Sequence, residues 1–316
     1  MRYEEIIQTE DTDCLYDMWR EYRESLTEYI IASVEHDYIR RQLREEAILR
    51  PKKAYNIEEM LKAQKEKPVL AIWGAGGCND IDIVRLSNCF RLVLIDRDVE
   101  KIKAARMRFG LGEQECLCVN LHFWNIEHED YKLFEAMLRD QERYEVVEAY
   151  LRKMTEDMYT PDYTALPDFD YSVVVGLASQ LNVRLAAMAD VYGAYGMLAG
   201  VLREMNEAAV HKLMEAVEHM TRRQIILGYE LQNVSMNSEE EAEHLRLCLD
   251  EEREYADFVS NRVLIAGNDV LERYVHMQIE TKRWNILCHR ALLWRFSRRK
   301  RYLMLNLTLV RQGDLD

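Results

Sequence analysis

Two glycines and one aspartate are the residues of this sequence whose chemistry is most direct. Gly74 and Gly76 follow the apolar run VLAIW at 69–73, and Asp96 ends a second apolar run, RLVLID at 91–96. A ligand can approach the backbone closely at a glycine, which has no side chain. An aspartate at a strand end, twenty residues after the second glycine, can accept hydrogen bonds from both hydroxyls of a ribose. These residues predict a site for a ligand that contains adenosine.

Two kinds of adenosine ligand fit this pattern, and Asn79 bears on the choice between them. The dinucleotide fingerprint G-x-G-x-x-G requires a third glycine at position 79, where this chain has asparagine. S-adenosylmethionine contains no pyrophosphate, so its site needs neither that glycine nor a phosphate-binding helix end. The glycine spacing therefore favours S-adenosylmethionine over NAD(P), whereas the aspartate at the strand end suits both ligands.

Two further carboxylates, Asp80 and Asp82, follow the glycines directly. One of them could face the ammonium group of the ligand. The alternative is that both are acids at the start of a helix, where the positive end of the helix dipole favours negative charge. The sequence leaves both interpretations open.

The elements that position these residues form an alternating pattern of strands and helices. Five apolar runs separated by helical patterns predict a parallel sheet with helices on both faces. These runs lie at 69–73, 91–96, 115–124, 170–178 and 222–231. Two more strand-like runs, at 285–296 and 301–310, are joined by only four residues, SRRK. A connection this short excludes a parallel crossover, so the chain should end in an antiparallel hairpin. We therefore expect an α/β fold with a seven-stranded sheet.

The front of the chain has no strand pattern. Apolar residues recur at three- and four-residue steps over 12–50, which predicts helix, and Pro51 closes the segment. A second short helix is expected over 57–66. We divide the chain into an N-terminal helical extension at 1–65 and a ligand-binding domain at 66–316. A mostly helical insertion is expected at about 235–285, opening at Ser238 with the capping-box sequence Ser-Glu-Glu-Glu.

From about residue 66 to the C-terminus, this layout resembles the class I S-adenosylmethionine-dependent methyltransferases, which have a Rossmann-like fold. The resemblance rests on the G-x-G of Gly74 and Gly76 after the first strand and on five parallel strands finished by an antiparallel hairpin. Two positions depart from the family pattern. Ile72 stands where an acidic residue is frequent, and Cys78 stands where a third glycine is common.

The resemblance implies S-adenosylmethionine as cofactor and S-adenosylhomocysteine as product. It also implies that a side chain after the third strand binds the adenine edge, and Asn125 matches that place. The predicted cofactor-binding residues are Gly74, Ala75, Gly76, Asp80, Asp96, Arg97, Asn125 and Ser179. The family's appended helices commonly cover the acceptor pocket, which makes the 1–65 extension a candidate lid with Tyr16, Tyr22 and Tyr29 as lid residues.

The turn after the fourth strand bears on the acceptor. Family members that methylate nucleic acids and some protein amides carry an Asn-Pro-Pro-Tyr segment there, and this chain has Ser179, Gln180 and Asn182 instead. This difference favours a small-molecule acceptor. A polar turn that only caps the next helix is the alternative. No residue pattern identifies a catalytic base.

The overall composition limits the partners. The 316 residues carry a net charge of -14, which disfavours nucleic acid, and the one basic cluster, Arg298–Arg301, suits a hairpin tip. No apolar stretch is long enough for a membrane span, and the acidic N-terminus does not resemble a signal peptide. Seven cysteines without a C-x-x-C pair and scattered histidines predict no metal site and a cytoplasmic location. A homo-oligomer is compatible with the sequence.

Taken together, the sequence predicts a methyltransferase for a small molecule of unknown identity. Two alternatives stay open. One is an NAD(P)-dependent oxidoreductase, and the other is a non-catalytic protein that binds a nucleotide or S-adenosylmethionine.

Overall fold

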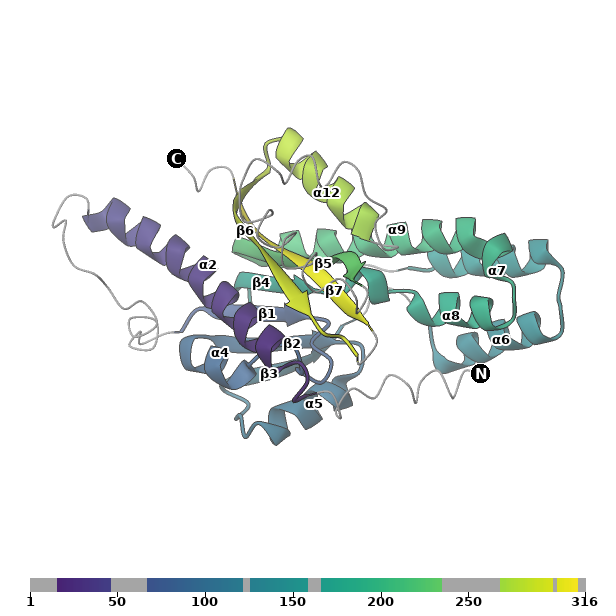
Figure 1. Ribbon diagram of the computed structural model, residues 1–316, viewed down its shortest axis with the longest axis horizontal. Coiled ribbons are helices and arrows are strands. Elements are labelled where there is room, and N and C mark those ends of the chain that lie inside the picture. The colour runs from purple at the N-terminus through teal and green to yellow at the C-terminus, as the bar shows by residue number, and fades with distance from the viewer. Residues whose placement is uncertain are drawn as a thin grey trace.

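The computed structural model of the chain describes residues 16–46, 67–121, 126–158, 166–234, 268–297 and 300–311. Its centre is a seven-stranded sheet with the order β3-β2-β1-β4-β5-β7-β6 (Figure 1). The strands are β1 (Val69–Trp73), β2 (Arg91–Asp96), β3 (Cys116–Asn120), β4 (Phe169–Val175), β5 (Thr221–Val234), β6 (Trp284–Trp294) and β7 (Arg301–Arg311). The helices are α2 (Arg20–Glu46), α4 (Ile83–Cys89), α5 (Val99–Arg108), α6 (His128–Arg139), α7 (Tyr144–Glu156), α8 (Val183–Val191), α9 (Tyr195–Met220) and α12 (Asn268–Glu280), with one 3₁₀ turn, η2 (Ala178–Gln180).

The sheet has the mixed topology that the sequence predicted. Strands β1 to β5 pair in parallel, and β7 pairs antiparallel with both β5 and β6. The hairpin therefore inserts its second strand between β5 and its own first strand. From β1 the sheet is built outward in one direction, through β2 to β3, and from β4 it is built in the opposite direction, to β5. The sheet therefore changes direction between β1 and β4. Ligands of open α/β sheets bind at such a point.

Both faces of the sheet are covered, as expected for parallel strands made only of apolar residues. Strand β1 is buried throughout and sends alternate side chains to the two sides. Leu70 and Ile72 pack in a core shared with α2, α4 and α5. Ala71 and Trp73 pack in a second core shared with α9 and α12. The N-terminal helix α2 is thus one of the helices that cover the sheet.

A helical lobe extends from one side of the sheet (Figure 1). Helices α6, α7 and α8 share a third core with the first half of α9, from Leu198 to Ala209. The second half of α9, from Val210 to Met220, packs on the sheet. This long helix therefore connects the lobe to the sheet.

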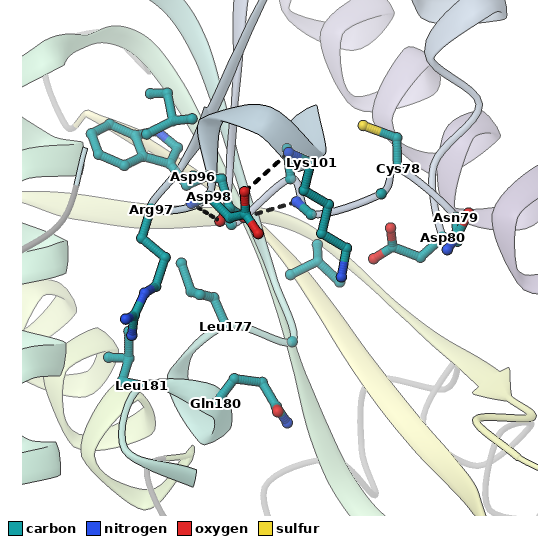
Figure 2. Close-up of a pocket in the computed structure, with 18 of the residues that line it drawn as sticks. Cys78, Asn79, Asp80, Asp96, Arg97, Asp98, Lys101, Leu177, Gln180 and Leu181 are labelled. Carbon is teal, nitrogen blue, oxygen red and sulfur yellow. Dashed lines mark hydrogen bonds between the residues drawn. The ribbon is translucent and has the colours of Figure 1, made fainter. Parts of the chain in front are cut away.

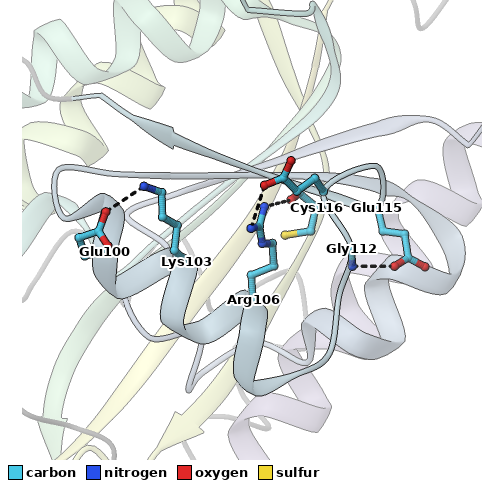
Figure 3. Close-up of polar contacts among 7 residues, drawn as sticks. Glu100, Lys103, Arg106, Gly112, Glu115 and Cys116 are labelled. Carbon is cyan, nitrogen blue, oxygen red and sulfur yellow. Dashed lines mark hydrogen bonds and ion pairs between the residues drawn. The ribbon is translucent and has the colours of Figure 1, made fainter.

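Helix α5 is anchored to β3 by polar contacts at its C-terminal end (Figure 3). The Arg106 guanidinium donates to the Cys116 carbonyl at 3.5 Å and to Glu113 Oε1 at 3.2 Å. The Gly112 amide donates to Glu115 Oε2 at 2.9 Å within the same connection. The positive charge of an arginine near the C-terminus of a helix also interacts favourably with the negative end of the helix dipole. These contacts fix the start of the edge strand.

Strands β1 and β2 begin and end where expected, and most other strand limits differ from the expected ones by one or two residues. The third strand was predicted to reach 124 but ends at Asn120. The fourth strand was predicted to reach 178 but ends at Val175, because Gly176 adopts a left-handed backbone with φ +63°. The described part of the 235–285 insertion contains α12. The predicted helix at 57–66, the Ser238 capping box and Arg298 lie outside the described residues. Of the described helices, none has a stretch long and apolar enough to cross a membrane.

Candidate functional site

A cavity of about 710 Å³ lies at the carboxyl ends of β1, β2 and β4. Its wall includes the glycine loop after β1, the residues from Ile95 to Lys101 and the turn after β4. Aromatic side chains from both ends of the chain, Trp19 and Trp294, complete it. Its volume is in the range of small-molecule sites. The cavity therefore lies at the point where the sheet changes direction.

The glycine loop follows a backbone path that favours glycine. Gly74 and Gly76 have φ of +70° and +49°. A Cβ at Gly74 would come within 2.7 Å of Leu177 Cδ1, whereas a Cβ at Gly76 would meet only the Gly74 carbonyl oxygen, at 4.0 Å. The left-handed backbone thus favours glycine at both positions, and a side chain at Gly74 would also have to displace the side chain of Leu177. The second glycine leaves open space beside the cavity.

Cys78 also has a left-handed backbone, with φ +52°. A side chain in this conformation costs about 1–2 kcal/mol relative to glycine. The family pattern commonly has glycine at this position, and the backbone geometry supplies the physical reason. The Cys78 side chain is buried, and burial raises the pKa of its thiol, with a further contribution from the negative charge of Asp80. The thiol is therefore held in its neutral form.

Asp96 connects the end of β2 to the glycine loop. Its Oδ2 accepts a hydrogen bond from the Gly76 amide at 2.8 Å, and its Oδ1 accepts one from the Asp98 amide at 2.9 Å. Backbone hydrogen bonds from Gly74 and Ala75 to the Ile95 carbonyl hold the same loop. Each carboxylate oxygen has two lone pairs, so each can accept one more donor. The predicted ribose acceptor thus lines the cavity beside the second glycine.

The cavity has two chemically different ends (Figure 2). At one end lie Arg97 and Leu181, and the Arg97 guanidinium donates to the Tyr131 hydroxyl at 3.0 Å. At the other end lie Cys78 and Asp80. Asp96 lies between the two ends, which is the order expected for a ligand with a central ribose.

Asp80 and Asp82 have different roles in the structure. Asp82 is the N-cap of α4, where its Oδ1 accepts a hydrogen bond from the Arg85 amide at 2.9 Å. Asp80 lines the cavity instead. Burial raises the pKa of Asp80 to about 6, although the positive charge of Arg23 opposes the shift. The helix-start interpretation therefore holds for Asp82 alone.

Two arginines from distant parts of the sequence hold the loop at 77–79. Arg108, at the end of α5, donates to the Gly77 carbonyl at 2.6 Å and to Asn79 Oδ1 at 2.9 Å. Arg23, in α2, donates to the Asn79 carbonyl at 3.0 Å. Both partners lie tens of residues away in the sequence, so no local pattern reveals them. The asparagine at position 79 thus has its own structural role.

The remaining predicted residues are placed differently from one another. Ser179 is not among the residues that line the cavity, and its hydroxyl donates to Glu230 Oε1 at 3.0 Å. Gln180 lines the cavity. Asn125 lies outside the described residues. No cluster of histidine, cysteine or acidic residues that could hold a metal occurs in the described part of the chain.

The three tyrosines considered as lid residues lie near α2. Tyr29 is buried, and its hydroxyl is 2.9 Å from Thr308 Oγ1 on β7, which indicates a structural role. Tyr22 is buried and stacks on Trp294, with ring centroids 5.1 Å apart. The ring of Tyr16 lies 3.6 Å from the Arg23 guanidinium carbon. A lid function for the extension stays a prediction.

No protein-family model matches the chain, and no curated protein matches it. Among solved structures, it is similar to a TehB-like S-adenosylmethionine-dependent methyltransferase from Corynebacterium glutamicum, with 13% identity, 89% of this chain and 99% of that chain covered, and a TM-score of 0.32. It is also similar to a precorrin-6y C5,15-methyltransferase from Geobacter metallireducens, with 12% identity, coverage of 82% and 91%, and a TM-score of 0.33. A third structure is a putative RNA methyltransferase from Pyrococcus horikoshii, with 7% identity, coverage of 83% and 90%, and a TM-score of 0.37.

Proposed function

We propose that the protein is an S-adenosylmethionine-dependent methyltransferase that acts on a small molecule. One observation carries the proposal, which is the cavity at the sheet's change of direction with Gly76 and Asp96 in its wall. The Asp96 carboxylate keeps lone pairs for the ribose hydroxyls, and the open space at Gly76 admits a ligand against the backbone. The antiparallel hairpin that finishes the sheet supports the same family.

The residues present fit S-adenosylmethionine from end to end. Arg97 and Leu181 would lie at the adenine end, and Asp80 would face the ammonium group at the methionine end. When bound, S-adenosylmethionine supplies a methyl group on a positively charged sulfur. The protein's contribution is to hold the acceptor in line with that methyl group and to exclude water.

The structure offers a specific argument against a dinucleotide. Nucleotide pyrophosphates bind at the N-terminus of the helix after the first strand, where free backbone amides and the helix dipole attract anions. Here that helix, α4, has seven residues and is capped by the Asp82 carboxylate. The half-buried Asp80 adds a second acidic group on the same side. A pyrophosphate at this position would meet two acidic side chains.

Isothermal titration calorimetry with S-adenosylhomocysteine and NADH tests the proposal. We expect S-adenosylhomocysteine to bind with one site per chain and NADH not to bind. Replacing Asp96 with alanine should weaken S-adenosylhomocysteine binding roughly 10- to 100-fold, because charge-assisted hydrogen bonds to the ribose are lost. Thermal unfolding of the variant checks that the fold is retained. Asp96→Asn keeps one acceptor oxygen, so its affinity for S-adenosylhomocysteine should lie between those of the wild type and Asp96→Ala.

Two results would contradict the proposal. Tight NADH binding without S-adenosylhomocysteine binding would favour an oxidoreductase. Unchanged affinity in a folded Asp96→Ala protein would show that the ribose lies elsewhere. A turnover assay distinguishes the non-catalytic alternative from a methyltransferase. The alternative predicts that the cofactor binds but that no labelled methyl group is transferred to any compound in a broad acceptor panel.

A further inference from the structure

The Asp80 end of the cavity has an aromatic wall built from both ends of the chain. Trp19 precedes α2, Trp294 ends β6, and Phe296 follows it. The ring centroids of Trp19 and Trp294 are 5.1 Å apart, and those of Trp294 and Phe296 are also 5.1 Å apart. The Trp19 indole N–H donates to the Phe296 carbonyl at 3.0 Å. These contacts fix the wall rigidly at the edge of the sheet.

A buried carboxylate lies next to this wall. Glu230, on β5, is only 3% exposed. A Cβ at Gly176, which lines the cavity, would lie 3.7 Å from the Trp294 ring and 4.0 Å from Glu230 Oε1. The Glu230 carboxylate thus lies close to Gly176 and Trp294, two residues of the cavity wall near the end of β4.

The partners of Glu230 do not neutralise its charge. Ser179 donates to its Oε1 at 3.0 Å, and Asn268 donates to its Oε2 at 2.9 Å. Both donors are uncharged, and across the described ranges no lysine or arginine forms an ion pair with this carboxylate. Burying an uncompensated negative charge is costly, and a nearby cation offsets that cost.

Two polar groups beside the wall also lack partners. Within the described residues, neither the Tyr22 hydroxyl nor the Trp294 indole N–H has a hydrogen bond, although the side chains are only 2% and 7% exposed. Burial, followed by the negative charges of Asp80 and Glu230, raises the pKa of Tyr22. The hydroxyl therefore lies within electrostatic range of both carboxylates.

We propose that this end of the cavity binds the methyl acceptor and that the acceptor is an amine, which enters as an ammonium ion. An ammonium ion is attracted to the faces of aromatic rings and to the carboxylate of Glu230, whereas Asp80 is assigned to the ammonium group of the cofactor. An anionic acceptor would be repelled by the carboxylate of Glu230, and a neutral acceptor would leave its charge uncompensated. The inference rests on the methyltransferase function proposed above and specifies its substrate class.

The chemistry of such a transfer balances without a further reagent. The ammonium first gives its proton to water, which restores the nitrogen lone pair. The nitrogen then forms a bond to the methyl carbon while the sulfur–carbon bond breaks, and the electron pair stays on sulfur. Glu230 acts here by its charge, which favours the cation in the pocket, and not as a group that bonds to the reacting atoms.

Binding of matched probes to the full chain tests the inference. With the cofactor site saturated by S-adenosylhomocysteine, benzylamine, benzyl alcohol and benzoate are titrated while tryptophan fluorescence is followed. Trp19 and Trp294 in the wall should report binding. We expect benzylamine to bind at least roughly tenfold more tightly than the other two, and tetramethylammonium to compete with it.

Two variants identify the groups responsible. Glu230→Gln should weaken benzylamine binding roughly tenfold or more, without changing the affinity for S-adenosylhomocysteine. Phe296→Leu keeps apolar volume but removes an aromatic face, and it should weaken tetramethylammonium binding roughly threefold or more. Glu272→Gln is the matched control, because Glu272 is also a buried glutamate but, unlike Glu230, is not among the nearest neighbours of a Cβ at Gly176. It should leave both affinities unchanged.

The outcomes separate the two proposals. If S-adenosylhomocysteine binds but benzyl alcohol or benzoate binds as tightly as benzylamine, the amine inference is wrong and the cofactor assignment stands. The same conclusion follows if neither Glu230→Gln nor Phe296→Leu changes the affinity for the cationic probes. If S-adenosylhomocysteine itself does not bind, the proposed function fails, and selective benzylamine binding would then support only a cation site.

Discussion

At the scale of single residues, Asp80 gives the site a dependence on pH. Its pKa is raised from 3.8 to about 6, mainly because burial disfavours the charged form. A carboxyl group with a raised pKa holds its proton more tightly in the folded state. Its contribution to stability is therefore fully present below about pH 4 and is lost as the pH rises through about 6. The shift corresponds to at most about 3 kcal/mol.

This loss of stability with rising pH leads to a prediction for Asp80→Asn. The variant should be more stable than the wild type at neutral pH, by up to about 3 kcal/mol, and the difference should vanish towards about pH 4. Urea unfolding of both proteins across this range measures it. A difference that stays constant with pH would show that Asp80 ionises normally. The gain in stability should come with weaker S-adenosylhomocysteine binding, if this carboxylate faces the ligand's ammonium group.

Some site residues could be predicted from the sequence, and others could not. Gly74, Gly76 and Asp96 line the cavity, and their place there is predictable because it depends on local backbone geometry next to strand ends. Their role in cofactor binding stays a prediction. Ser179 follows β4 as expected, but its hydroxyl donates to Glu230, a contact across 51 residues that no local pattern encodes. The same limit applies to Arg108, which holds the glycine loop from the end of another helix.

At the scale of elements, two glycines in regular secondary structure have opposite roles. Gly228 lies within β5, where a Cβ would come within 2.6 Å of Asn306 Oδ1 on β7 and 2.9 Å of Val175 Cγ2 on β4. Gly200 lies within α9, is exposed, and a Cβ there would meet nothing within 4 Å. The first glycine allows the hairpin to pack against the parallel strands, and the second only weakens its helix.

Substitution by alanine should therefore change stability in opposite directions. Gly228→Ala should destabilise the protein by about 1–3 kcal/mol through overpacking between three strands. Gly200→Ala should stabilise it by about 0.5–1 kcal/mol, because alanine restricts the unfolded chain and favours helix. Chemical denaturation of the two variants provides the comparison. Equal effects of the two substitutions would contradict the packing argument.

The elements themselves were predicted better than their ends. The limits of β1 and β2 follow from short apolar runs with clear boundaries. For β4, the apolar pattern continues through Gly176, Leu177 and Ala178 and predicts a longer strand. The left-handed backbone of Gly176 ends the strand earlier. Periodicity detects the environment of a side chain, whereas a strand end depends on a single backbone angle.

At the scale of the whole molecule, the net charge of -14 should keep nucleic acids away. Phosphate backbones bind proteins mainly through the release of counterions by lysine and arginine. We expect a fluorescent single-stranded RNA to bind with a dissociation constant larger than roughly 100 micromolar at physiological salt, as measured by anisotropy. Tight, salt-sensitive RNA binding would contradict the small-molecule proposal and favour an RNA acceptor.

The contacts of α2 with the C-terminal hairpin have a consequence for synthesis of the protein. Tyr29 pairs with Thr308, and Trp19 packs on Trp294, so the apolar side of α2 is buried partly by the last strands of the chain. On the ribosome, α2 emerges before β6 and β7, and its apolar side is not fully covered until both strands have been made. Nascent chains will therefore expose part of the α2 face to chaperones until β6 and β7 are synthesised, and the aromatic wall can form only then.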